Sequence, residues 1–418
     1  MSEWKEYKSE KLGNYIKDIA AGPFGSNLKV ECFVPEGFPI IDGANLKGFK
    51  VTDNVSKFVT EEKARSLHRA IAKRNDVVVT ISGNVGQISY IPKDSAYEEY
   101  LVSQRQFRVT FDTTRVFVPY LVYYFHTHEG QYKILSFANQ TGVPALSQPL
   151  KNFRNIDIVL PPLSTQRRIS SILSSLDDKI AINRRICENL EAQAQALFKH
   201  WFIDFAPFKN GKFVESELGM IPEGCRVGTL GEICTTNKRT LSSKNIPDVI
   251  EYLDTGNITA NKIDDIQILH KGQDKIPSRA KRLVSEGDVI FSSVRPNQRH
   301  YGLLMNPSPF LVVSTGFVVI TASWSGYRYF IYSFLIQNSI IETLQAIGEQ
   351  SVSTYPSINA NDIESLKIII PRMEDIEDFA DICCNFYCKI ESLVQESSRL
   401  SFLRDTLLPK LMSGEIKV

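Results

Sequence analysis

The sequence lacks the short motifs that carry base modification or nucleotide binding. It has no Asn-Pro-Pro-aromatic tetrad for holding a flipped adenine, no Gly-x-Gly-x-x-Gly fingerprint and no Gly-x-x-x-x-Gly-Lys-Ser/Thr phosphate loop. Two partial matches, Asn306–Phe310 and Gly22–Gly25, are better interpreted as turns, because the first has the wrong spacing and the second follows no buried strand. Catalysis is therefore expected to belong to other chains.

Cysteine, long apolar runs and excess charge are also scarce. The seven cysteines form no framework spacing and no paired Cys/His set, which favours reduced thiols over disulfides or a metal site. No segment is apolar enough to span a membrane, and the N-terminus lacks the apolar run of a signal peptide, so a cytoplasmic location is expected.

The charge balance argues against a strongly basic, self-sufficient nucleic-acid binder. The formal net charge is only +1; residues 1–210 hold 27 Lys and Arg against 22 Asp and Glu, and residues 211–418 hold 21 against 25. If DNA is the ligand, partner chains are expected to supply much of the contact with phosphates. The length of 418 residues, with 43% hydrophobic and 23% charged residues, suits two domains that each bury a core.

The sequence contains an internal duplication. The strand end Ile156–Pro162 matches Leu366–Arg372 after a shift of 210 positions. Upstream, Ile40–Leu46 resembles Tyr252–Ile258 after a shift of 212 positions, so a small insertion separates the two stretches. A period this long indicates a duplicated domain rather than a solenoid repeat, and it predicts internal pseudo-twofold symmetry.

Each copy predicts a mixed α/β domain. In the first copy, β-branched and aromatic runs at Val77–Ile81 and Phe107–Phe111 alternate with Gly/Asn/Pro turns, and one helix is expected from Val118 to Ser136. The second copy repeats this pattern, with two strands and one helix at Asp288–Ser293, Gly316–Thr321 and Tyr327–Ala346. The segment Phe205–Gly211 is the predicted hinge between the copies.

Each copy ends in one long amphipathic helix. Apolar residues recur there with alternating spacings of four and three, which is the pattern of a coiled-coil seam. The first seam is Ile169, Leu173, Leu176, Ile180, Asn183, Cys187, Leu190, Ala194, Leu197 and Trp201. The second seam is Phe379, Cys383, Phe386, Ile390, Leu393, Ser397, Leu400, Arg404 and Leu407, with Pro409 expected to end the helix.

The two seams predict that the helices pack on each other as an antiparallel pair. A helix of roughly 37 residues is about 55 Å long at about 1.5 Å per residue, so the pair would form a spacer between the domains. Polar Asn183 and Ser397 would fix its register at some cost in stability. The alternative is that each helix packs only on its own domain.

Four motifs resemble the specificity subunit of Type I restriction-modification systems. They are Leu160–Ile169, Leu176–Ile180, Glu217–Gly224 and Leu403–Ile416. The resemblance covers the whole chain, and four motifs in the right order are more specific than any one of them. It implies two target recognition domains that each read one half of a bipartite, asymmetric DNA sequence, and two helices that set the gap and dock methyltransferase subunits.

The resemblance implies an α+β fold: two pseudo-twofold-related mixed α/β target recognition domains joined by two long antiparallel coiled-coil helices. The implied divisions are residues 1–162 and 209–371 for the domains and 163–208 and 372–418 for the helices. The implied partners are double-stranded DNA, two methyltransferase subunits and restriction subunits, with no membrane. The chain itself would be non-catalytic and without cofactor; S-adenosylmethionine would belong to the methyltransferase partner, and ATP and magnesium to any restriction subunit.

Base reading needs polar side chains on loops at the edge of a rigid domain, where Arg takes guanine and Asn or Gln takes adenine. In the first copy the candidate DNA-binding residues are Asn45, Lys47, Ser82, Asn84, Gln87, Gln104, Arg105, Gln140 and Thr141. In the second copy they are Asn257, Arg295, Asn297, Gln298, Arg299, Gln350 and Ser351. Any one of them is as readily a solvated loop residue, whereas matching loops of different chemistry suit two domains that read different half-sites.

Two other classes of function stay open from the residues alone. A stand-alone methyltransferase with cryptic motifs would bind S-adenosylmethionine by itself, and a coiled-coil scaffold would bind no DNA even with its partners. The absent motifs disfavour the enzyme, and the polar loops disfavour the scaffold.

Overall fold

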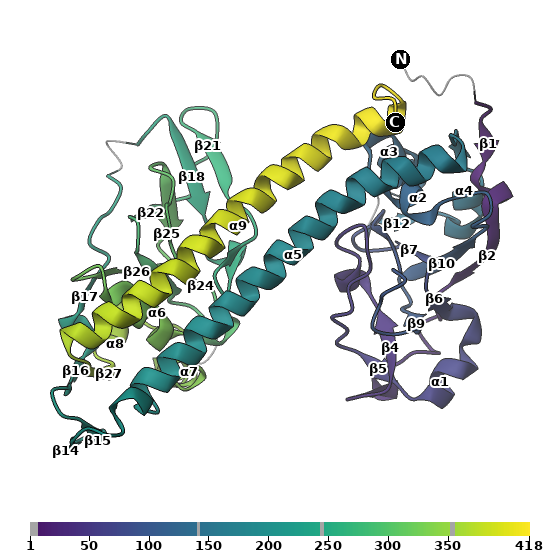
Figure 1. Ribbon diagram of the computed structural model, residues 1–418. Helices are drawn as coiled ribbons and strands as arrows, with labels where there is room; N and C mark the ends of the chain where they lie inside the picture. The colour runs from purple at the N-terminus through teal and green to yellow at the C-terminus, as the bar shows by residue number, and fades with distance from the viewer. Residues whose placement is uncertain (1–6, 140–142, 243–245, 352–355) are drawn as a thin grey trace. The chain divides into compact units, whose positions relative to one another are not determined.

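The computed structural model describes residues 7–139, 143–242, 246–351 and 356–418 (Figure 1). The chain forms two compact units: Met1–Ala181 with Ser398–Val418, and Ile182–Ser397. Each unit holds one copy of the repeat and a stretch of both long helices. The predicted divisions after residues 162, 208 and 371 instead separate the recognition domains from the long helices. These divisions stay a prediction.

The two largest β-sheets among the described residues of the first unit have four and five strands. The four-stranded sheet has the order β2-β10-β7-β8 and is antiparallel throughout, with strands Ile16–Ala21, Gln106–Phe111, Val77–Thr80 and Ile88–Tyr90. The second sheet has the order β3-β5-β4-β9-β6, with strands Phe33–Val34, Phe58–Val59, Phe38–Ile41, Glu99–Val102 and Ile71–Lys73. In this sheet β4 and β9 are parallel, so both strands end at the same edge.

The buried strand β7 shows why these sheets stack in layers. Successive side chains of a strand point to opposite faces. Val77 and Val79 enter the core shared with the helices α2 (Val118–Phe125), α4 (Pro149–Arg154) and the start of α5, whereas Val78 enters the core of the second sheet. A run that is apolar on both faces therefore forms an inner layer.

The second unit repeats this arrangement. Its antiparallel sheet has the order β17-β26-β23-β24, with strands Cys234–Thr236, Phe317–Ala322, Val289–Ser292 and Tyr301–Leu303. Its other sheet has the order β21-β18-β25-β22, with strands Gln267–His270, Val249–Leu253, Leu311–Ser314 and Ala280–Leu283. Strands β18 and β25 are parallel, as β4 and β9 are in the first unit.

Small features repeat as well, which confirms the duplication. The isolated bridge between Ser82 and Ala145 has a counterpart between Val294 and Ser357, and both partners are shifted by 212 positions. Short antiparallel pairs close each domain: β1 (Glu10–Lys11) with β13 (Asp157–Ile158), and β16 (Arg226–Thr229) with β27 (Lys367–Ile370).

The single helix predicted in each domain is wrong, because each is two helices. In the first domain α2 ends at Phe125 and α3 (His128–Leu135) starts anew, because the Thr127 hydroxyl accepts a hydrogen bond from the Gly130 N–H at 3.1 Å and caps the second helix. In the second domain α6 (Tyr327–Leu335) and α7 (Asn338–Ser351) are likewise separate. The apolar periodicity of the sequence continues through both breaks, so it predicted one helix in each domain instead of two.

The two long helices are α5 (Leu163–Phe202) and α9 (Met373–Ser413), drawn in teal and yellow in Figure 1. In the second unit, Asn183 Nδ2 donates to Ser397 Oγ at 3.3 Å, and the Cys187 thiol lies 3.9 Å from the Ile390 carbonyl oxygen. Residue numbers rise along one helix as they fall along the other, so the predicted antiparallel pairing is confirmed. The two polar seam positions meet directly.

Each long helix completes the core of both domains. In the first unit, Leu408, Leu411 and Met412 of α9 are buried in one cluster with Ile169 and Leu173 of α5. In the second unit, the buried α5 residues Ala194, Phe198 and Phe202 belong to one cluster with the start of α9. The alternative that each helix packs only on its own domain is therefore excluded.

The prediction that Pro409 ends the second helix is wrong. Helix α9 continues through Pro409 to Ser413. A proline inside a helix removes the N–H that would bond to the carbonyl four residues earlier and costs about 3 kcal/mol. Burial of Leu408, Leu411 and Met412, which flank the proline, offsets this cost.

No helix of the described residues combines the length and apolarity needed to cross a membrane.

We predict that Leu411→Ala destabilises the first unit by about 2–5 kcal/mol, because Leu411 is 1% exposed and truncation leaves a cavity. Urea unfolding would measure the change. Phe402→Ala, on the same helix at a side chain that is 75% exposed, is the matched control and is expected to change the free energy of unfolding by no more than about 0.5 kcal/mol. Equal stability of the two variants would contradict the packing of the helix end.

Candidate nucleic-acid interface

Three loops of the first domain meet at one edge of its sheets. The loops are residues 42–48 after β4, 81–87 after β7 and 103–106 after β9, and together they are called the first loop edge. Strands β4 and β9 are parallel and end side by side. The end of β7 lies beside the start of β10, because Thr80 pairs with Gln106. The sheet topology thus gathers segments that are about 20 to 60 residues apart in the sequence.

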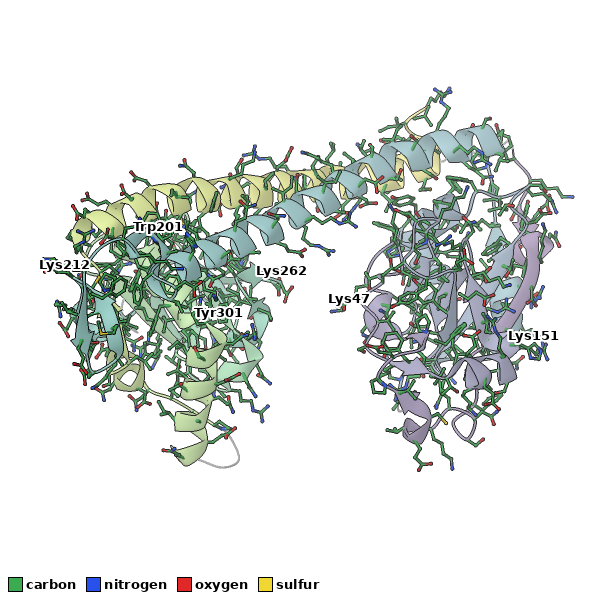
Figure 2. All side chains as sticks on the ribbon, turned by 60° about the horizontal axis from the view of Figure 1, so that its bottom comes forward. Lys47, Lys151, Trp201, Lys212, Lys262 and Tyr301 are labelled. Carbon is green, nitrogen blue, oxygen red and sulfur yellow. The ribbon has the colours of Figure 1, made fainter. Side chains whose placement is uncertain are left out.

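The predicted residues of the first domain, apart from Gln140 and Thr141, lie on the first loop edge. Lys47 extends from the surface of the domain (Figure 2), and Asn84, Gln104 and Arg105 are also exposed. Arg105 lies beside the loop of Ser82, since a Cβ at Gly83 would be 3.7 Å from its guanidinium. Gln104 donates from Nε2 to the Leu28 carbonyl oxygen at 2.8 Å.

Asn45 and Gln87 are more enclosed than their neighbours. Asn45 is 3% exposed; its amide nitrogen donates to the carbonyl oxygens of Thr52 and Asn54, and its Oδ1 accepts from the Asp42 N–H. These bonds occupy the groups that would read a base, so the geometry supports a structural role for Asn45. Gln87 is half-buried and its Oε1 accepts from the Thr80 hydroxyl at 3.2 Å, which leaves its amide nitrogen for other partners.

The second domain has a corresponding second loop edge, formed by residues 254–257, 293–299 and 314–316. The parallel strands β18 and β25 end there together, and Ser292 at the end of β23 pairs with Phe317 at the start of β26. Asn257 stands where Asn45 stands in the first domain, yet its side chain makes no hydrogen bond with the described residues. The equivalent position is therefore locked in one domain and available in the other.

Two arginines of the second loop edge have unusual backbone conformations. Arg295 and Arg299 flank the short helix η9 (Pro296–Gln298), and both are left-handed, with φ of 48° and 58°. Non-glycine residues in this region carry strain that the surrounding structure must support. Here the loop is held by the Arg295 N–H, which donates to the Pro356 carbonyl oxygen at 2.9 Å.

The remaining candidates are placed as follows. Asn297 and Gln298 are exposed between the two arginines, and Gln350 is exposed near the end of α7. Gln140, Thr141 and the side chain of Ser351 lie outside the described residues. The structure thus brings six of the predicted first-domain residues to the first loop edge beside Asn45, and five of the second-domain residues to the second loop edge.

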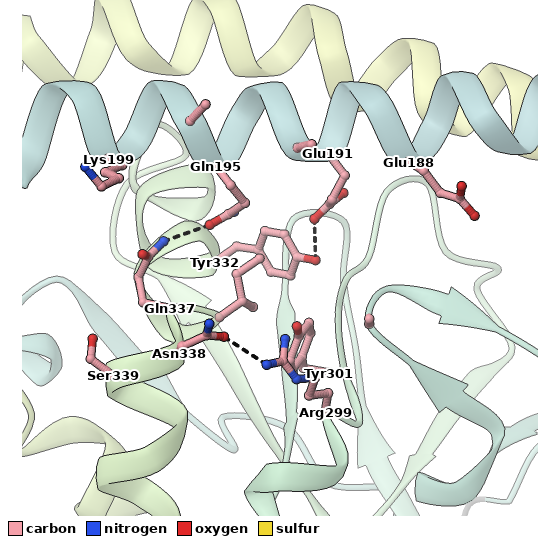
Figure 3. A pocket seen from close by; sticks show the side chains of 14 residues that line it. Glu188, Glu191, Gln195, Lys199, Arg299, Tyr301, Tyr332, Gln337, Asn338 and Ser339 are labelled. Carbon is pink, nitrogen blue, oxygen red and sulfur yellow. Dashed lines mark hydrogen bonds between the residues drawn. The ribbon is translucent and has the colours of Figure 1, made fainter. Parts of the chain in front are cut away.

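A pocket of about 630 Å³ opens between α5 and the domain in the second unit (Figure 3). Its walls carry amide and ionisable side chains: Glu188, Glu191, Gln195, Lys199, Arg299, Gln337 and Asn338. Gln337 Nε2 donates to Gln195 Oε1 at 2.8 Å, and the Arg299 guanidinium donates to Asn338 Oδ1 at 2.8 Å. These bonds tie α5 to the turn between α6 and α7, and the second loop edge to α7.

Glu191 is the buried polar centre of this joint. Its carboxylate accepts hydrogen bonds from the hydroxyls of Tyr332 at 2.7 Å and Tyr387 at 3.4 Å, and from Asn261 Nδ2 at 3.4 Å. Burial raises the pKa of Glu191, and the hydrogen bonds from Tyr332, Asn261 and Tyr387, which lower it, only partly oppose this rise. One side chain thereby connects α5, α6, α9 and the turn between β19 (Ile258–Thr259) and β20 (Lys262–Ile263).

The described residues contain no cluster of three or more His, Cys, Asp or Glu side chains that could hold a metal ion. Cys383 is buried in the core, and the thiols of Cys384 and Cys388 lie 3.8 Å apart on one face of α9.

Polar contacts between the long helices and the domains, called polar joints below, were not predicted from the sequence. In the first unit, Asp177 of α5 accepts from the hydroxyl of Tyr123 and, at 2.8 Å, from the guanidinium of Arg404. Glu191 with its two tyrosines is the counterpart in the second unit. A charged residue at a seam position, such as Arg404, was the available signal, because a buried cation needs a carboxylate nearby.

The chain thus contains two copies of one layered domain, and each copy presents a loop edge with exposed polar side chains. Comparisons with known proteins identify the class of protein to which this fold belongs. The family model described as the Type I restriction modification DNA specificity domain matches residues 4–192 and 222–400. The chain belongs to this family; it is a specificity subunit of a Type I restriction-modification system, and it recognises DNA sequence.

Relatives of full length support the assignment. The chain is 26% identical to the Type I restriction enzyme MjaIX specificity subunit of Methanocaldococcus jannaschii, over 96% of this chain and 93% of that protein. It is 23% identical to the HindI specificity subunit of Haemophilus influenzae, with both chains covered completely. The fold is similar to that of the S subunit from M. genitalium, with a TM-score of 0.56, 15% identity, and 97% and 96% of the two chains covered. Specificity subunits are non-catalytic and carry no cofactor themselves.

We predict that Glu191→Gln changes the pH dependence of stability. The pKa of Glu191 is raised in the folded state, so the wild-type free energy of unfolding falls as the pH rises from the ordinary carboxyl pKa to the raised one, because the buried group must ionise. Glutamine removes this loss. The variant is therefore expected to gain stability relative to the wild type as the pH rises through that interval.

Thermal or urea unfolding between pH 4 and pH 8 would measure this difference. Burial also raises the pKa of Asp76 and of Asp288, but both are present in wild type and variant and cancel in the comparison. Glu188→Gln, at an exposed residue of the same pocket, is the control and should leave the profile unchanged. Parallel profiles for Glu191→Gln and wild type would contradict the role of burial.

Proposed function

We propose that this subunit reads a bipartite, asymmetric DNA target, one half-site with each loop edge, and recruits methyltransferase and restriction subunits to it. The observation that carries the proposal is that two domains of one topology present loop edges of different chemistry. Matching geometry suits two half-sites of one duplex, and different side chains suit two different sequences.

In the first domain, amides and hydroxyls dominate the proposed contacts. We assign base or phosphate contacts to Lys47, Ser82, Asn84, Gln87, Gln104 and Arg105. Gln140 and Thr141 stay candidates, and Asn45 holds the loop in shape. Asn and Gln side chains pair with adenine through N6 and N7, so this edge suits a half-site that contains adenine.

In the second domain, the amides are accompanied by two arginines, Arg295 and Arg299. We assign contacts to Asn257, Arg295, Asn297, Gln298, Arg299 and Gln350, with Ser351 as a further candidate. Arg295 and Arg299 lie on a strained loop that the rest of the domain holds in place, which is the support that a positioned guanidinium needs to reach guanine O6 and N7.

We further propose that the long helices dock two methyltransferase subunits at equivalent positions. Ile172 of α5 and Ile382 of α9 occupy the same place in the repeat, 210 positions apart, and each is 37% exposed. An apolar side chain repeated on two helices suits two copies of one partner. The methyltransferase would supply S-adenosylmethionine chemistry, and a restriction subunit would use ATP and magnesium, all in the cytoplasm.

The scaffold alternative accounts for the helices but not for the loops. A scaffold needs no strained arginines and no available Asn257 at the position where Asn45 is locked. The stand-alone methyltransferase lacks the tetrad and glycine-rich motifs that hold a base and its cofactor.

The experiment that tests the function is coexpression with the methyltransferase subunit in a methylation-deficient host, followed by mapping of N6-methyladenine across the genome by single-molecule sequencing. A bipartite motif that appears only with this chain is the expected result. A copurifying complex that adds no methylation would contradict the proposal.

We predict that Arg295→Ala relaxes the motif in one half-site only and that Arg105→Ala relaxes the other half-site only. Each lost base contact should cost about 1–3 kcal/mol of discrimination. The methylation map of each variant is the measurement, and each variant is the control for the other. Changes in the same half-site, or an unchanged motif for both, would reject the assignment of one domain to each half.

We also predict that four residues inserted in the exposed middle of α5 change the gap between half-sites or abolish assembly. Four residues exceed one helical turn, so they lengthen the helix by about 6 Å and shift the seam out of phase. The methylation map and copurification with the methyltransferase would show the result. Assembly with the wild-type gap would count against the spacer role.

A further inference from the structure

The segment that joins β2 to β4 in the first domain exposes apolar side chains next to the first loop edge. Phe24 and Val30 are each 80% exposed, more than any other large apolar residue described. Between them, Leu28 is only 4% exposed and belongs to the core of the second sheet. The segment is therefore anchored at its middle and offers an apolar residue on either side of the anchor.

The conformation of this segment is fixed by its contacts with the loop 103–106. The Gly22 N–H donates to the Gln106 carbonyl oxygen at 2.8 Å, and a Cβ at Gly22 would lie 1.9 Å from the Ser103 carbonyl oxygen, so only glycine fits there. Gln104 holds the Leu28 carbonyl oxygen, and the Asn27 N–H donates to the Phe24 carbonyl oxygen at 2.8 Å. Phe24 is thus presented on a defined turn beside Gln104.

The ring of an exposed phenylalanine is in contact with water, and its transfer onto an apolar ligand surface lowers the free energy. In DNA, apolar side chains meet two such surfaces: the C5-methyl group of thymine in the major groove, and the face of a base that is unstacked by a wedge. Both surfaces belong to bases, not to the phosphate backbone.

The second domain provides an internal comparison. Its corresponding segment, between β17 and β18, begins with exposed Lys238 and Arg239 instead of an exposed aromatic residue. It too is tied to the sheet, because the Leu241 N–H donates to the Lys281 carbonyl oxygen at 2.7 Å. The same place in the fold thus carries an apolar residue in one copy and cations, which suit phosphates, in the other.

We propose that Phe24 packs its ring on the apolar surface of a base in the half-site read by the first domain, and so contributes to its sequence preference. This inference rests on the proposed function. It adds a fourth loop, residues 22–30, to the first loop edge and assigns to it an apolar contact in place of hydrogen-bonded reading.

The test uses the complex of this chain with its methyltransferase subunit and a duplex that carries the mapped target. Phe24→Ala is expected to weaken binding to this duplex by about 5- to 30-fold. It should barely change binding to unrelated DNA and should relax the methylation motif in the first half-site. Phe310→Ala, at an exposed phenylalanine before β25 and at the end of that strand away from the second loop edge, is the control and is expected to leave the motif unchanged.

Two substituted duplexes identify the base surface. Replacement of the half-site thymines by deoxyuridine lowers wild-type affinity but not that of Phe24→Ala if Phe24 contacts a methyl group. An increase of 2-aminopurine fluorescence in the half-site, present in wild type and absent in Phe24→Ala, indicates an unstacked base.

Unchanged affinity and motif for Phe24→Ala would overturn the inference, and so would an equal loss on target and unrelated DNA, which indicates a backbone contact. Thermal unfolding of Phe24→Ala should match the wild type, because the ring is exposed. If the wild-type complex itself shows no bipartite motif, the proposed function fails instead, and the two failures are distinguished.

Discussion

The constraint on which the structure depends is that neither domain completes its own core. The first domain buries the last turns of α9, with Leu411 1% exposed, and the second buries the last turns of α5, with Ala194 fully buried. Each helix must therefore leave one copy of the repeat and end in the other. Loss of the long helices would expose apolar surface in both domains, so burial of apolar area keeps each helix end packed on its domain.

Polar contacts then give these apolar joints a defined geometry. Asp177 in the first unit is neutralised by Arg404, whereas Glu191 in the second unit is held by tyrosine hydroxyls and an amide. A buried carboxylate is costly unless its acceptors are satisfied, so each joint favours one arrangement of helix and domain over its shifted alternatives. Asn183 and Ser397 do the same for the seam, since a one-turn slip would separate them.

The positions of the loops in each loop edge are set by the strands that they connect. Parallel strands bring the ends of β4 and β9 together, and antiparallel pairing adds the end of β7, so residues far apart in sequence share one surface. The loops vary while the strands repeat, so one topology can carry different side chains at equivalent positions of its two loop edges, such as Gln87 in the first domain and Arg299 in the second.

The sequence by itself determined the duplication, the strand runs, the two seams and the antiparallel pairing of their helices, because apolar periodicity and internal matches are local properties of the chain. It also placed most candidate contact residues on loops. Only the tertiary structure showed that Thr127 divides one expected helix and that α9 passes through Pro409, since capping and burial override periodicity. It also separated Asn45, buried with all its hydrogen-bonding groups in use, from the exposed residues near it, and it exposed Phe24. Burial and hydrogen-bond partners arise from contacts between distant segments, and no local pattern contains them.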